Sequence, residues 1–234
     1  TQEELVERGA VATKFSPFGG IYDGAPSSID LIVARKAGVQ DEGSQLVAKI
    51  FADVAKDQKT WLDLCAGPGG KAALLSAIAK NEDIVFSANE ISEVRAKLVA
   101  QVVQGAEVTT LDAREIALLG KTYGAILADV PCTGLGALRR RPEVRWRRSV
   151  GDLKSLVLLQ EQIIDAAISV LSPGGIFGYA TCSPHLSETR IAIAETLKRH
   201  PEMELVNLSE YVDSELQESA IAVSYTHLTL PTKA

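Results

Sequence analysis

Hydrophobic and polar positions along the chain follow two periods, which together predict a regular alternation of strands and helices. Short apolar runs typical of buried strands are separated by stretches in which hydrophobic residues recur three or four positions apart, as on one face of a helix. This alternation favours an α/β fold, in which helices cover both faces of a mostly parallel sheet. Strands are predicted at residues 60–64, 84–88, 107–111, 123–130, 176–181 and 204–208. Helices are predicted at residues 44–54, 71–79, 92–104, 152–171 and 188–199.

The two ends of the chain do not share this pattern. Residues 1–43 are rich in turn-forming residues, and we expect little more than short strands and loops before Gly38. We therefore treat residues 1–43 as an N-terminal appendage and residues 44–222 as the main domain. Residues 223–234 break the pattern again and resemble read-through of a cloning or adapter sequence, so we interpret them as a non-native tail.

Composition limits the class of protein. With 234 residues, of which 46% are hydrophobic and 23% charged, the chain has the make-up of an ordinary globular protein. No apolar run is long enough to span a membrane, and the N-terminus carries no basic and apolar leader, so we predict a cytoplasmic protein. Three cysteines make no disulfide framework, and three histidines without ligand spacing predict no metal site. The net charge of −6 gives no general indication of nucleic acid binding.

The residues that stand out chemically fall just after predicted strands. In a parallel sheet the carboxyl ends of the strands meet at one edge, and ligands bind in the crevice outside that edge. We therefore expect one site built from several strand ends. The clusters at such positions are residues 63–70, 89–90, 112–114, 129–132 and 181–184.

The first cluster, Asp63-Leu-Cys-Ala-Gly-Pro-Gly-Gly-Lys71, joins a strand to a helix through a glycine-rich bend. Gly67, Gly69 and Gly70 let a ligand approach the main chain closely, and the start of the next helix offers N–H donors. Asp63 places a carboxylate where a cationic or hydroxyl-bearing ligand would lie. A tight turn without any ligand is the alternative interpretation of such a bend.

Carboxylates around this bend favour a particular cofactor. Glu90 follows the second strand about 20 residues after the glycines, where an acid can accept hydrogen bonds from ribose hydroxyls. Together with Asp63, Asp112 and Asp129 it suits a positively charged cofactor without phosphates, such as S-adenosylmethionine. A solvated acid at Glu90 and a helix N-cap at Asp112 remain alternatives. The predicted cofactor-binding residues are Asp63, Cys65, Ala66, Gly67, Pro68, Gly69, Gly70, Lys71, Glu90, Arg95, Asp112 and Asp129.

Two cysteines follow the strands nearest the expected methyl donor, in the stretches Asp129-Val-Pro-Cys132-Thr-Gly-Leu-Gly136 and Ala180-Thr-Cys182-Ser-Pro184. Together with the glycine bend and two further stretches, they make the chain similar to the Sun/Fmu family of RNA (cytosine-5) methyltransferases. The further stretches are Gly38-Val-Gln-Asp-Glu-Gly-Ser-Gln45 and Arg139-Arg-Arg-Pro-Glu-Val-Arg-Trp146. The resemblance is closest to the bacterial type that acts on small-subunit ribosomal RNA. It implies a Rossmann-like fold that depends on S-adenosyl-L-methionine, with ribosomal RNA as the partner.

The resemblance also implies roles for the two thiols. Carbon 5 of cytosine is too weak a nucleophile to take a methyl group directly. A thiolate therefore adds at carbon 6, carbon 5 attacks the sulfonium methyl group, and loss of the carbon 5 proton releases the enzyme. By the resemblance, Cys182 is the nucleophile and Cys132 assists elimination and product release. Asp129 would bind the base edge and supply a proton to ring nitrogen 3.

Other interpretations of the cysteines stay open. A DNA cytosine-5 methyltransferase would use Cys132, on the Pro-Cys strand, as its nucleophile. A buried small hydrophobic residue is the ordinary role of a lone cysteine, and we assign only that role to Cys65. Replacing Cys182 by alanine separates the two methyltransferase hypotheses.

An arginine-rich segment follows the Pro-Cys stretch. Residues 139–148 contain six arginines, with Trp146 among them. Guanidinium groups contact phosphates and Trp146 can stack on an unpaired base, so we predict an RNA-binding loop, with a solvated charged loop as the alternative. The predicted RNA-binding residues are Arg139, Arg140, Arg141, Arg145, Trp146 and Arg148.

The chain departs from the family pattern in two respects. Family members carry Glu-Asn-Glu after the second cysteine stretch, whereas residues 187–190 read Ser-Glu-Thr-Arg. Bacterial relatives also carry an N-terminal RNA-binding domain that resembles the antitermination factor NusB, so we expect a fragment in which residues 1–43 are a remnant of an RNA-binding subdomain. A non-catalytic RNA-binding module that kept the fold is therefore the alternative to a methyltransferase, which we expect to be a monomer.

Overall fold

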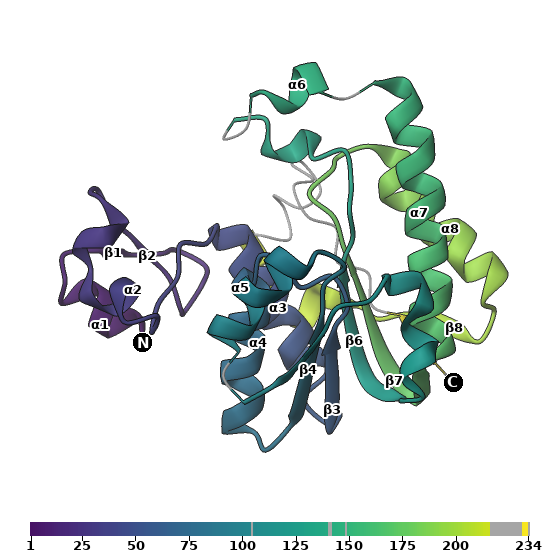
Figure 1. Cartoon of the computed structure of the whole chain (residues 1–234), viewed down its shortest axis with the longest axis horizontal. Helices are drawn as coiled ribbons and strands as arrows, with labels where there is room; N and C mark the ends of the chain where they lie inside the picture. Colours follow the sequence, from purple (N-terminus) through teal and green to yellow (C-terminus); the bar gives the residue numbers. More distant parts are fainter. Residues whose placement is uncertain (104, 140–141, 148, 216–230, 234) are drawn as a thin grey trace.

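A seven-stranded sheet forms the centre of the computed structural model, which describes residues 1–103, 105–139, 142–147, 149–215 and 231–233 (Figure 1). The strand order is β5-β4-β3-β6-β7-β9-β8. The first five strands in this order run parallel, and β9 pairs antiparallel with β7 and β8. The predicted mostly parallel α/β sheet is confirmed. Its strands are β3 Thr60–Asp63, β4 Val85–Asn89, β5 Glu107–Thr109, β6 Tyr123–Asp129, β7 Leu171–Ala180, β8 Met203–Leu205 and β9 Pro231–Lys233.

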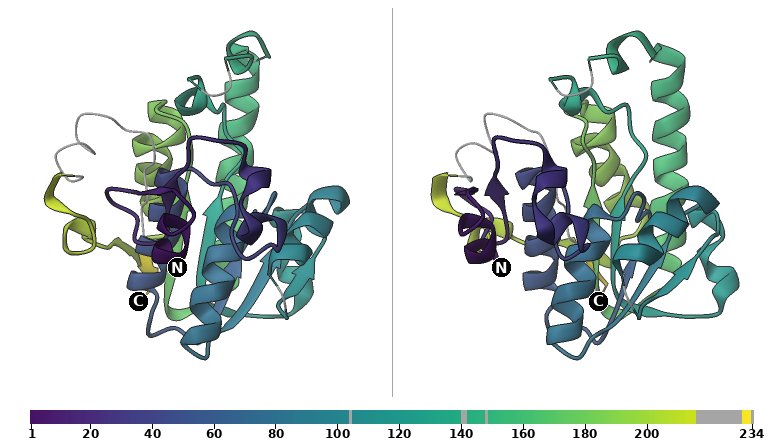
Figure 2. Two further views of the ribbon diagram at one scale, coloured as in Figure 1. Left: turned by 90° about the vertical axis from the view of Figure 1, so that its left-hand side faces the viewer. Right: turned by 60° about the vertical axis from the view of Figure 1, so that its left-hand side comes forward.

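Helices cover both faces of this sheet, as Figure 1 and the turned views of Figure 2 show. One face carries α3, α4 and α5, and the other carries α7, α8 and the 3-10 helix η2. The helices are α3 Glu42–Val54, α4 Gly70–Asn81, α5 Glu93–Val102, α6 Val144–Arg147, α7 Val150–Ser169 and α8 Arg190–Arg199. The 3-10 turns in the same part of the chain are η2 Ala113–Leu119, η3 Leu135–Ala137, η4 Leu186–Glu188 and η5 Leu208–Glu210.

The strands feed two separate cores because successive side chains of a strand point to opposite faces. In β3, Trp61 belongs to the core that contains Phe51 of α3, whereas Leu62 belongs to the core that contains Ile164 of α7. The Trp61 and Phe51 rings meet edge to face with centroids 5.8 Å apart, and Trp61 Nε1 donates to the carbonyl oxygen of Ala55. Both polar and apolar parts of this tryptophan are thus satisfied, which anchors β3 against α3.

The strand order leaves a crevice at one edge of the sheet. From the central β3 the chain runs outward to β4 and β5, and then returns to the other side of β3 to form β6 and β7. The connections after β3 and β6 therefore leave in opposite directions, which opens a crevice between the carboxyl ends of these two strands. Asp63 ends β3 and Asp129 ends β6, so two predicted site residues lie at its opposite walls.

Several element boundaries differ from the predicted ones. Strand β7 begins at Leu171 rather than at residue 176, because Leu171 pairs with Tyr123 and the register shifts before Ile176 pairs with Ala125. The arginine-rich segment contains the short helix α6, which the polar pattern did not predict. Strand β9 was not predicted either, because it lies in the tail of residues 223–234, which we had set aside. Most of that tail lies outside the described residues, so its assignment as non-native stays a prediction.

Residues 1–41 form a small lobe beside the main body (Figure 1). The expectation of only short strands and loops is wrong in part, because the lobe also contains two short helices. Its backbone is tied to α3, where Glu42 Oε1 accepts hydrogen bonds from the N–H groups of Phe15 and Ser16 at 2.7 and 3.0 Å. The lobe consists of α1 Gln2–Val6, β1 Val11–Ala12, β2 Gly20–Ile21, the 3-10 turn η1 Pro26–Ser28 and α2 Asp30–Val33.

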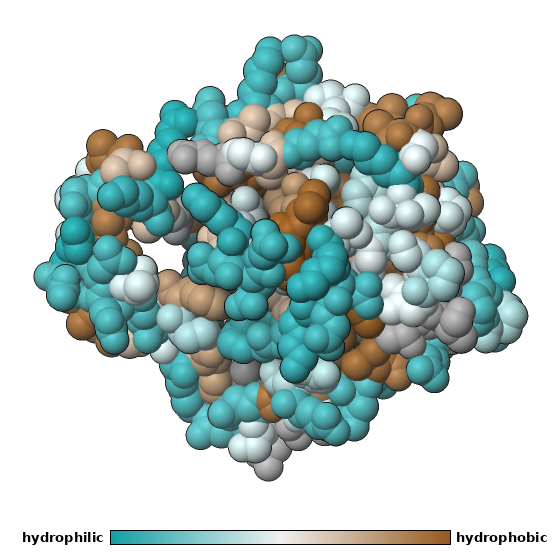
Figure 3. All heavy atoms as spheres, turned by 90° about the horizontal axis from the view of Figure 1, so that it is seen from below, coloured by the Kyte–Doolittle hydropathy of each residue, from teal (hydrophilic) through white to brown (hydrophobic). Residues whose placement is uncertain are grey.

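The outer surface adds little to the search for a site. Figure 3 views the molecule from below Figure 1, away from the carboxyl ends of the parallel strands; hydrophilic residues cover most of this face and hydrophobic ones lie in small separate groups. Within the described ranges, no helix has both the length and the apolar character needed to cross a membrane. The strand carboxyl ends therefore remain the place where unusual side chains converge.

Candidate active site

The glycine bend after β3 is shaped by close contacts that exclude side chains. A Cβ on Gly67 would lie 2.2 Å from Glu90 Oε2, and Gly69 has a φ of +114°, which favours glycine. At Gly70, in contrast, a Cβ would meet only Gln40 atoms at 3.4 Å or more. Gly70 itself is exposed, and it begins a helix whose N-cap residue Gly69 provides no side-chain cap. A ligand can reach the free N–H groups of the first helical turn there.

Asp63, at the end of β3, is a buried carboxylate next to this bend. Its side chain is 1% exposed, and neither oxygen has a well-formed hydrogen bond among the described residues. Burial raises the pKa of Asp63 to about 7 and the nearby charge of Asp129 adds to this effect, while Lys71 and the Cys65 amide oppose it. A buried acceptor without a partner costs free energy, so the arrangement suits a ligand that brings a cationic donor.

Glu90, after β4, lies under the bend and holds it in place. Its Oε2 accepts from Gly67 N–H at 3.0 Å, and its Oε1 accepts from Ser92 N–H at 2.8 Å and from Arg95 at 2.6 Å. The predicted cofactor residue Arg95 is therefore a partner of Glu90. Each carboxylate oxygen can accept two hydrogen bonds, so Oε2 retains capacity for a ribose hydroxyl.

Asn89, the last residue of β4, was noticed in the sequence only as a neighbour of Glu90. Its side-chain nitrogen donates to the carbonyl oxygens of Leu64 and Leu111, and its side-chain oxygen accepts from Thr109 and from Leu111 N–H. All these bonds lie between 2.8 and 3.2 Å. Asn89 thereby joins the carboxyl ends of β3, β4 and β5 and fixes the floor on which the bend rests.

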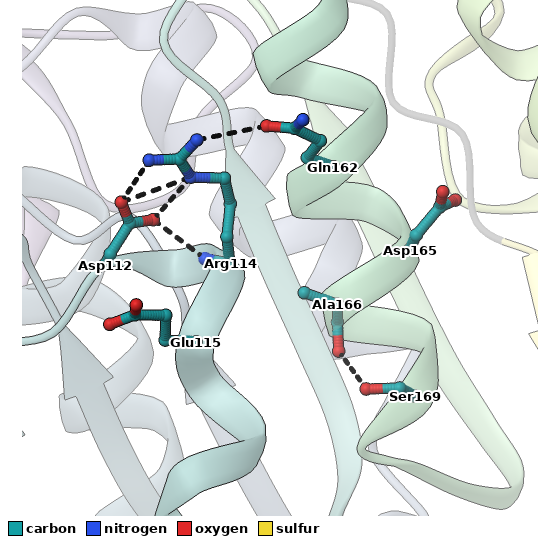
Figure 4. Close-up of a pocket in the computed structure, with 7 residues that line it drawn as sticks. All are labelled: Asp112, Arg114, Glu115, Gln162, Asp165, Ala166 and Ser169. Carbon is teal, nitrogen blue, oxygen red and sulfur yellow. Dashed lines mark hydrogen bonds and ion pairs between the residues drawn. The ribbon is translucent and has the colours of Figure 1, made fainter.

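Asp112 makes the contacts of a helix cap. Its Oδ1 accepts from Arg114 N–H at 3.0 Å, and the Arg114 guanidinium lowers the pKa of Asp112. Arg114 also donates to Gln162 of α7 at 3.1 Å, which connects η2 to that helix (Figure 4). The pocket of Figure 4 lies between these elements and includes neither the glycine bend nor the cysteines, so we place the candidate site at the strand ends instead.

The two predicted catalytic cysteines meet at the ends of β6 and β7. Their Sγ atoms lie 3.3 Å apart. Cys182 is exposed, whereas Cys132 is buried, with 9% of its surface accessible. The two loops are joined by a further bond from Gly136 N–H to the carbonyl oxygen of Cys182. One sulfur is therefore open to solvent and the other lies behind it, within contact distance.

This contact shifts the pKa values of the two thiols in opposite directions. A hydrogen bond from Cys182 lowers the pKa of Cys132 to about 7, with help from the Thr181 hydroxyl and backbone groups, although burial opposes it. The same hydrogen bond raises the pKa of Cys182. The contact therefore favours a single thiolate on the pair, with Cys132 as the more acidic sulfur. Burial and nearby carboxylates raise the pKa of Cys65, which agrees with its assignment as a packing residue.

Lys71 and Asp129 form an ion pair across the crevice. Lys71 Nζ donates to Asp129 Oδ2 at 2.7 Å, and its side chain is largely buried while that of Asp129 is half-buried. Lys71 comes from the first turn of α4 and Asp129 from the end of β6. Because Asp129 ends the strand that leads into the Cys132 loop, the ion pair lies at the same strand ends as the cysteines. The crevice thus connects the glycine bend to the thiols.

Glu188 is a site residue that the sequence analysis noted only as a departure from the family pattern. It is fully buried, and its two oxygens accept from the N–H and hydroxyl groups of Thr133 and from Gln160. The Thr133 hydroxyl also contacts Ser183 Oγ at 3.0 Å. Because Thr133 and Ser183 directly follow the two cysteines, one buried carboxylate connects both cysteine loops.

The predicted RNA-binding segment is only partly described. Arg139, Arg145 and Trp146 are exposed, and Trp146 is 82% exposed, so its indole ring is not part of the core. Arg140, Arg141 and Arg148 lie outside the described residues. The segment lies beyond the carboxyl end of β6, on the same side of the molecule as the cysteine loops (Figure 1).

Comparison with known proteins identifies the family. Residues 51–233 match the family model described as 16S rRNA methyltransferase RsmB/F. The chain belongs to the RsmB/F family. It is 48% identical over 200 residues to "Putative methyltransferase Rv1407" of Mycobacterium tuberculosis, covering 83% of this chain and 43% of the relative. It is 36% identical over 174 residues to ribosomal RNA small subunit methyltransferase B of Vibrio cholerae, covering 72% of this chain and 39% of the relative. The chain thus spans less than half the length of these curated relatives.

Solved structures support the same fold. The crystal structure of a methyltransferase homolog protein from Pyrococcus horikoshii superposes with a TM-score of 0.74 at 23% sequence identity, covering 100% of this chain and 83% of that one. The RsmB/F chain therefore has the Rossmann-like methyltransferase fold that the sequence predicted, and S-adenosyl-L-methionine is the cofactor of this fold and family.

The RsmB/F chain offers chemistry that fits this cofactor. Asp63 is a buried acceptor without a partner, which suits an ammonium or sulfonium group, and the exposed Gly70 lets a ligand approach the main chain at the start of α4. Lys71 and Asp129 continue the crevice toward the cysteines. The structure therefore brings together most of the predicted cofactor residues, with Asp112 engaged as a helix cap and Arg95 as a partner of Glu90.

Proposed function

We propose that this chain transfers the methyl group of S-adenosyl-L-methionine to carbon 5 of a cytosine in small-subunit ribosomal RNA, through a covalent bond between Cys182 and carbon 6. The observation that carries the proposal is the pair of sulfurs 3.3 Å apart, one exposed and one buried, beside the glycine bend. Family membership supports ribosomal RNA as the substrate. The target base must leave any stack or pair to reach Cys182.

The unequal acidity of the two thiols suggests how the nucleophile is activated. Cys182 passes its proton to the Cys132 thiolate as its sulfur bonds to carbon 6 of the cytosine. Ring nitrogen 3 takes up a proton from the carboxylic acid form of Asp129 and returns it to Asp129 when Cys182 leaves. The bound cofactor supplies an electrophilic methyl group for carbon 5. Cys132, after it has lost the transferred proton to solvent, takes the proton from carbon 5 as the bond between Cys182 and carbon 6 breaks. Cys182 then leaves as a thiolate.

Asp129 and Lys71 would orient the base. Asp129 Oδ2 is held by Lys71, and Asp129 lies at the end of β6, just before the Cys132 loop. A carboxylate in this position can accept a hydrogen bond from the exocyclic amine of cytosine, which uracil lacks. The exposed Arg139, Arg145 and Trp146 would contact the RNA on either side of the extruded base. We infer action in the cytoplasm from the ribosomal RNA substrate.

The test is methyl transfer from labelled cofactor to small-subunit ribosomal RNA, followed by mapping of 5-methylcytosine. We expect one labelled cytosine with the native chain, none with Cys182→Ala, and an unchanged product with the control Ser155→Ala, at an exposed position of α7. Label on adenine or guanine, or undiminished transfer by Cys182→Ala, would overturn the proposal.

A second candidate has one observation in its favour. The lowered pKa of Cys132 makes it the more acidic thiol, as a DNA cytosine-5 methyltransferase with its nucleophile on the Pro-Cys strand would require. Burial of Cys132 argues against direct attack, because Cys182 lies exposed in front of it. In this second candidate, Cys132→Ala rather than Cys182→Ala would prevent formation of a covalent bond with the nucleic acid.

A further inference from the structure

Two side chains near the glycine bend carry buried polar atoms that lack hydrogen-bond partners. They are Asp63, through both carboxylate oxygens, and Gln40, through its amide nitrogen Nε2. Across the described ranges, no other buried side-chain nitrogen or oxygen is left without a partner. Since a buried polar group without a partner costs free energy, unsatisfied groups that gather at one place point to a ligand that satisfies them.

Gln40 belongs to the segment that leads into α3, and its amide lies over the start of α4. A Cβ placed on Gly70 would be 3.4 Å from Gln40 Nε2, so this donor is directed at the first helical residue. α4 has 12 residues, and its N-cap Gly69 contributes no side-chain hydrogen bond. The first N–H groups of the helix and the Gln40 amide therefore present donors to the same space, at the positive end of the helix dipole. This combination suits an anionic group such as a carboxylate.

Asp63, which precedes the bend, presents the opposite chemistry. Asp63 is a hydrogen-bond acceptor and is almost completely buried. It stands four residues before Gly67, the first glycine of the bend, whereas Gly70 is the last. A ligand that satisfies both ends must carry a cationic donor near Asp63 and an anionic acceptor near Gln40. An α-amino acid has an ammonium and a carboxylate on one carbon, and the amino-acid end of S-adenosyl-L-methionine has this form.

We propose that Gln40 is a cofactor-binding residue that donates a hydrogen bond from Nε2 to the α-carboxylate of S-adenosyl-L-methionine, while Asp63 accepts from the α-ammonium group. The inference rests on the proposed use of this cofactor and adds a residue to its site. Gln40 is uncharged and does not follow a strand. Neither the pattern of carboxylates nor the glycine motif therefore identifies it as a binding residue.

The test compares two ligands that differ only in the amino-acid end. S-Adenosylhomocysteine carries the ammonium and carboxylate groups, whereas 5′-methylthioadenosine keeps the adenosine and the thioether but has neither. Their dissociation constants are measured by calorimetry with the native chain, with Gln40→Leu, which removes the donor, and with Gln40→Glu, which places a like charge against the carboxylate. Gln58→Leu is the control, because Gln58 donates to the Gly174 carbonyl oxygen away from the bend.

We expect Gln40→Leu to weaken S-adenosylhomocysteine roughly tenfold, as for loss of one hydrogen bond to a charged group, and Gln40→Glu to weaken it further. Binding of 5′-methylthioadenosine should change less than about twofold in both variants, which also shows that the site is folded. Gln58→Leu should change neither affinity. Equal weakening of both ligands by Gln40→Leu, or no weakening of either, would overturn the role of Gln40 while leaving the proposed function intact. A native chain that binds neither ligand would overturn the proposed function itself.

Discussion

The Sγ atom of Cys132 lies 3.3 Å from the Sγ atom of Cys182, although the two residues follow different strands. Strands β6 and β7 are parallel neighbours in register, with Asp129 opposite Ala180, so their carboxyl ends deliver both loops to the same point. The contact lets one thiol stabilise the thiolate of the other. A pair arranged in this way can supply a nucleophile and a proton acceptor from identical side chains.

The first prediction concerns the acidity of this pair. The thiolate exists above the pKa of the pair, so alkylation of the pair by iodoacetamide should accelerate as pH rises through about 7. Cys132→Ser removes the partner sulfur and should move the midpoint for Cys182 up to about 8.5, the value of an isolated thiol. Mass spectrometry of the alkylated peptides measures both midpoints. Identical midpoints in the two proteins would show that the sulfurs do not share a proton.

The second prediction concerns Glu188 as a positioning residue. Glu188→Ala leaves the Thr133 and Gln160 donors without their acceptor, so the free energy of unfolding should fall by roughly 2 kcal/mol. The cysteine loops would then separate, and kcat should fall more than tenfold with little change in the KM for the cofactor. Glu188→Gln keeps one acceptor oxygen and should recover most of both losses.

The thiol midpoint distinguishes positioning from stability alone. In Glu188→Ala the midpoint should rise toward the Cys132→Ser value, because the sulfurs no longer touch. If the Glu188→Ala variant is less stable but keeps the native midpoint of thiol alkylation, Glu188 has only a structural role.

The third prediction concerns Asp63 and pH. The folded pKa of about 7 lies above the unfolded value near 3.9, so between these pH values the folded state holds a proton that the unfolded state has lost. The contribution of Asp63 to stability therefore falls as pH rises from about 4 to about 7, and the penalty is complete above pH 7. Asp63→Asn should stabilise the ligand-free chain by roughly 2–4 kcal/mol at pH 8 and by much less at pH 4.

Denaturant unfolding at the two pH values measures this difference. Asp57→Asn, at an exposed position, is the matched control and should show no such dependence. An Asp63→Asn variant with the same small effect at both pH values would mean that folding does not raise the pKa of Asp63.

The fourth prediction concerns the arginine-rich segment. Charge reversal at Arg139 and Arg145, which are exposed, should weaken RNA binding and reduce the dependence of log K on log salt by about 0.7 for each lost phosphate contact. We expect the same result for Arg140 and Arg141, which are also predicted from the sequence to bind RNA. Lys121→Glu reverses a charge at the start of β6, far from the site, and should leave the salt slope unchanged. An unchanged dependence of log K on log salt in the arginine variants would mean that this segment is a solvated loop that does not contact RNA.

Parts of the fold and site that follow local rules could be predicted from the sequence. The alternating apolar pattern gave the parallel sheet, and the rule that ligands bind at strand carboxyl ends placed Asp63, Asp129 and both cysteines at one edge. The pairing of Leu171 with Tyr123 could not be predicted, because Ser172-Pro-Gly-Gly175 reads as a turn when only local propensity is considered. Strand contacts formed far apart in the chain decided that boundary.

The rest of the site depends on contacts between residues that are far apart in the chain. Gln40 and Glu188 act through groups 30 and 55 residues away, Gly70 and Thr133 respectively, and neither belongs to a pattern of charges or glycines. The lowered pKa of Cys132 likewise arises from a contact across two loops. Such relationships appear only once the chain is folded.

The central claim is that Cys182 bonds covalently to the RNA and that Cys132 completes the release. The most direct measurement is a denaturing gel of the Cys132→Ala chain after incubation with small-subunit ribosomal RNA and S-adenosyl-L-methionine. The account predicts a slowly migrating protein–RNA band that disappears when Cys182→Ala is added to the same chain. A band that persists without Cys182, or no band from Cys132→Ala while the native chain methylates the RNA, would contradict it.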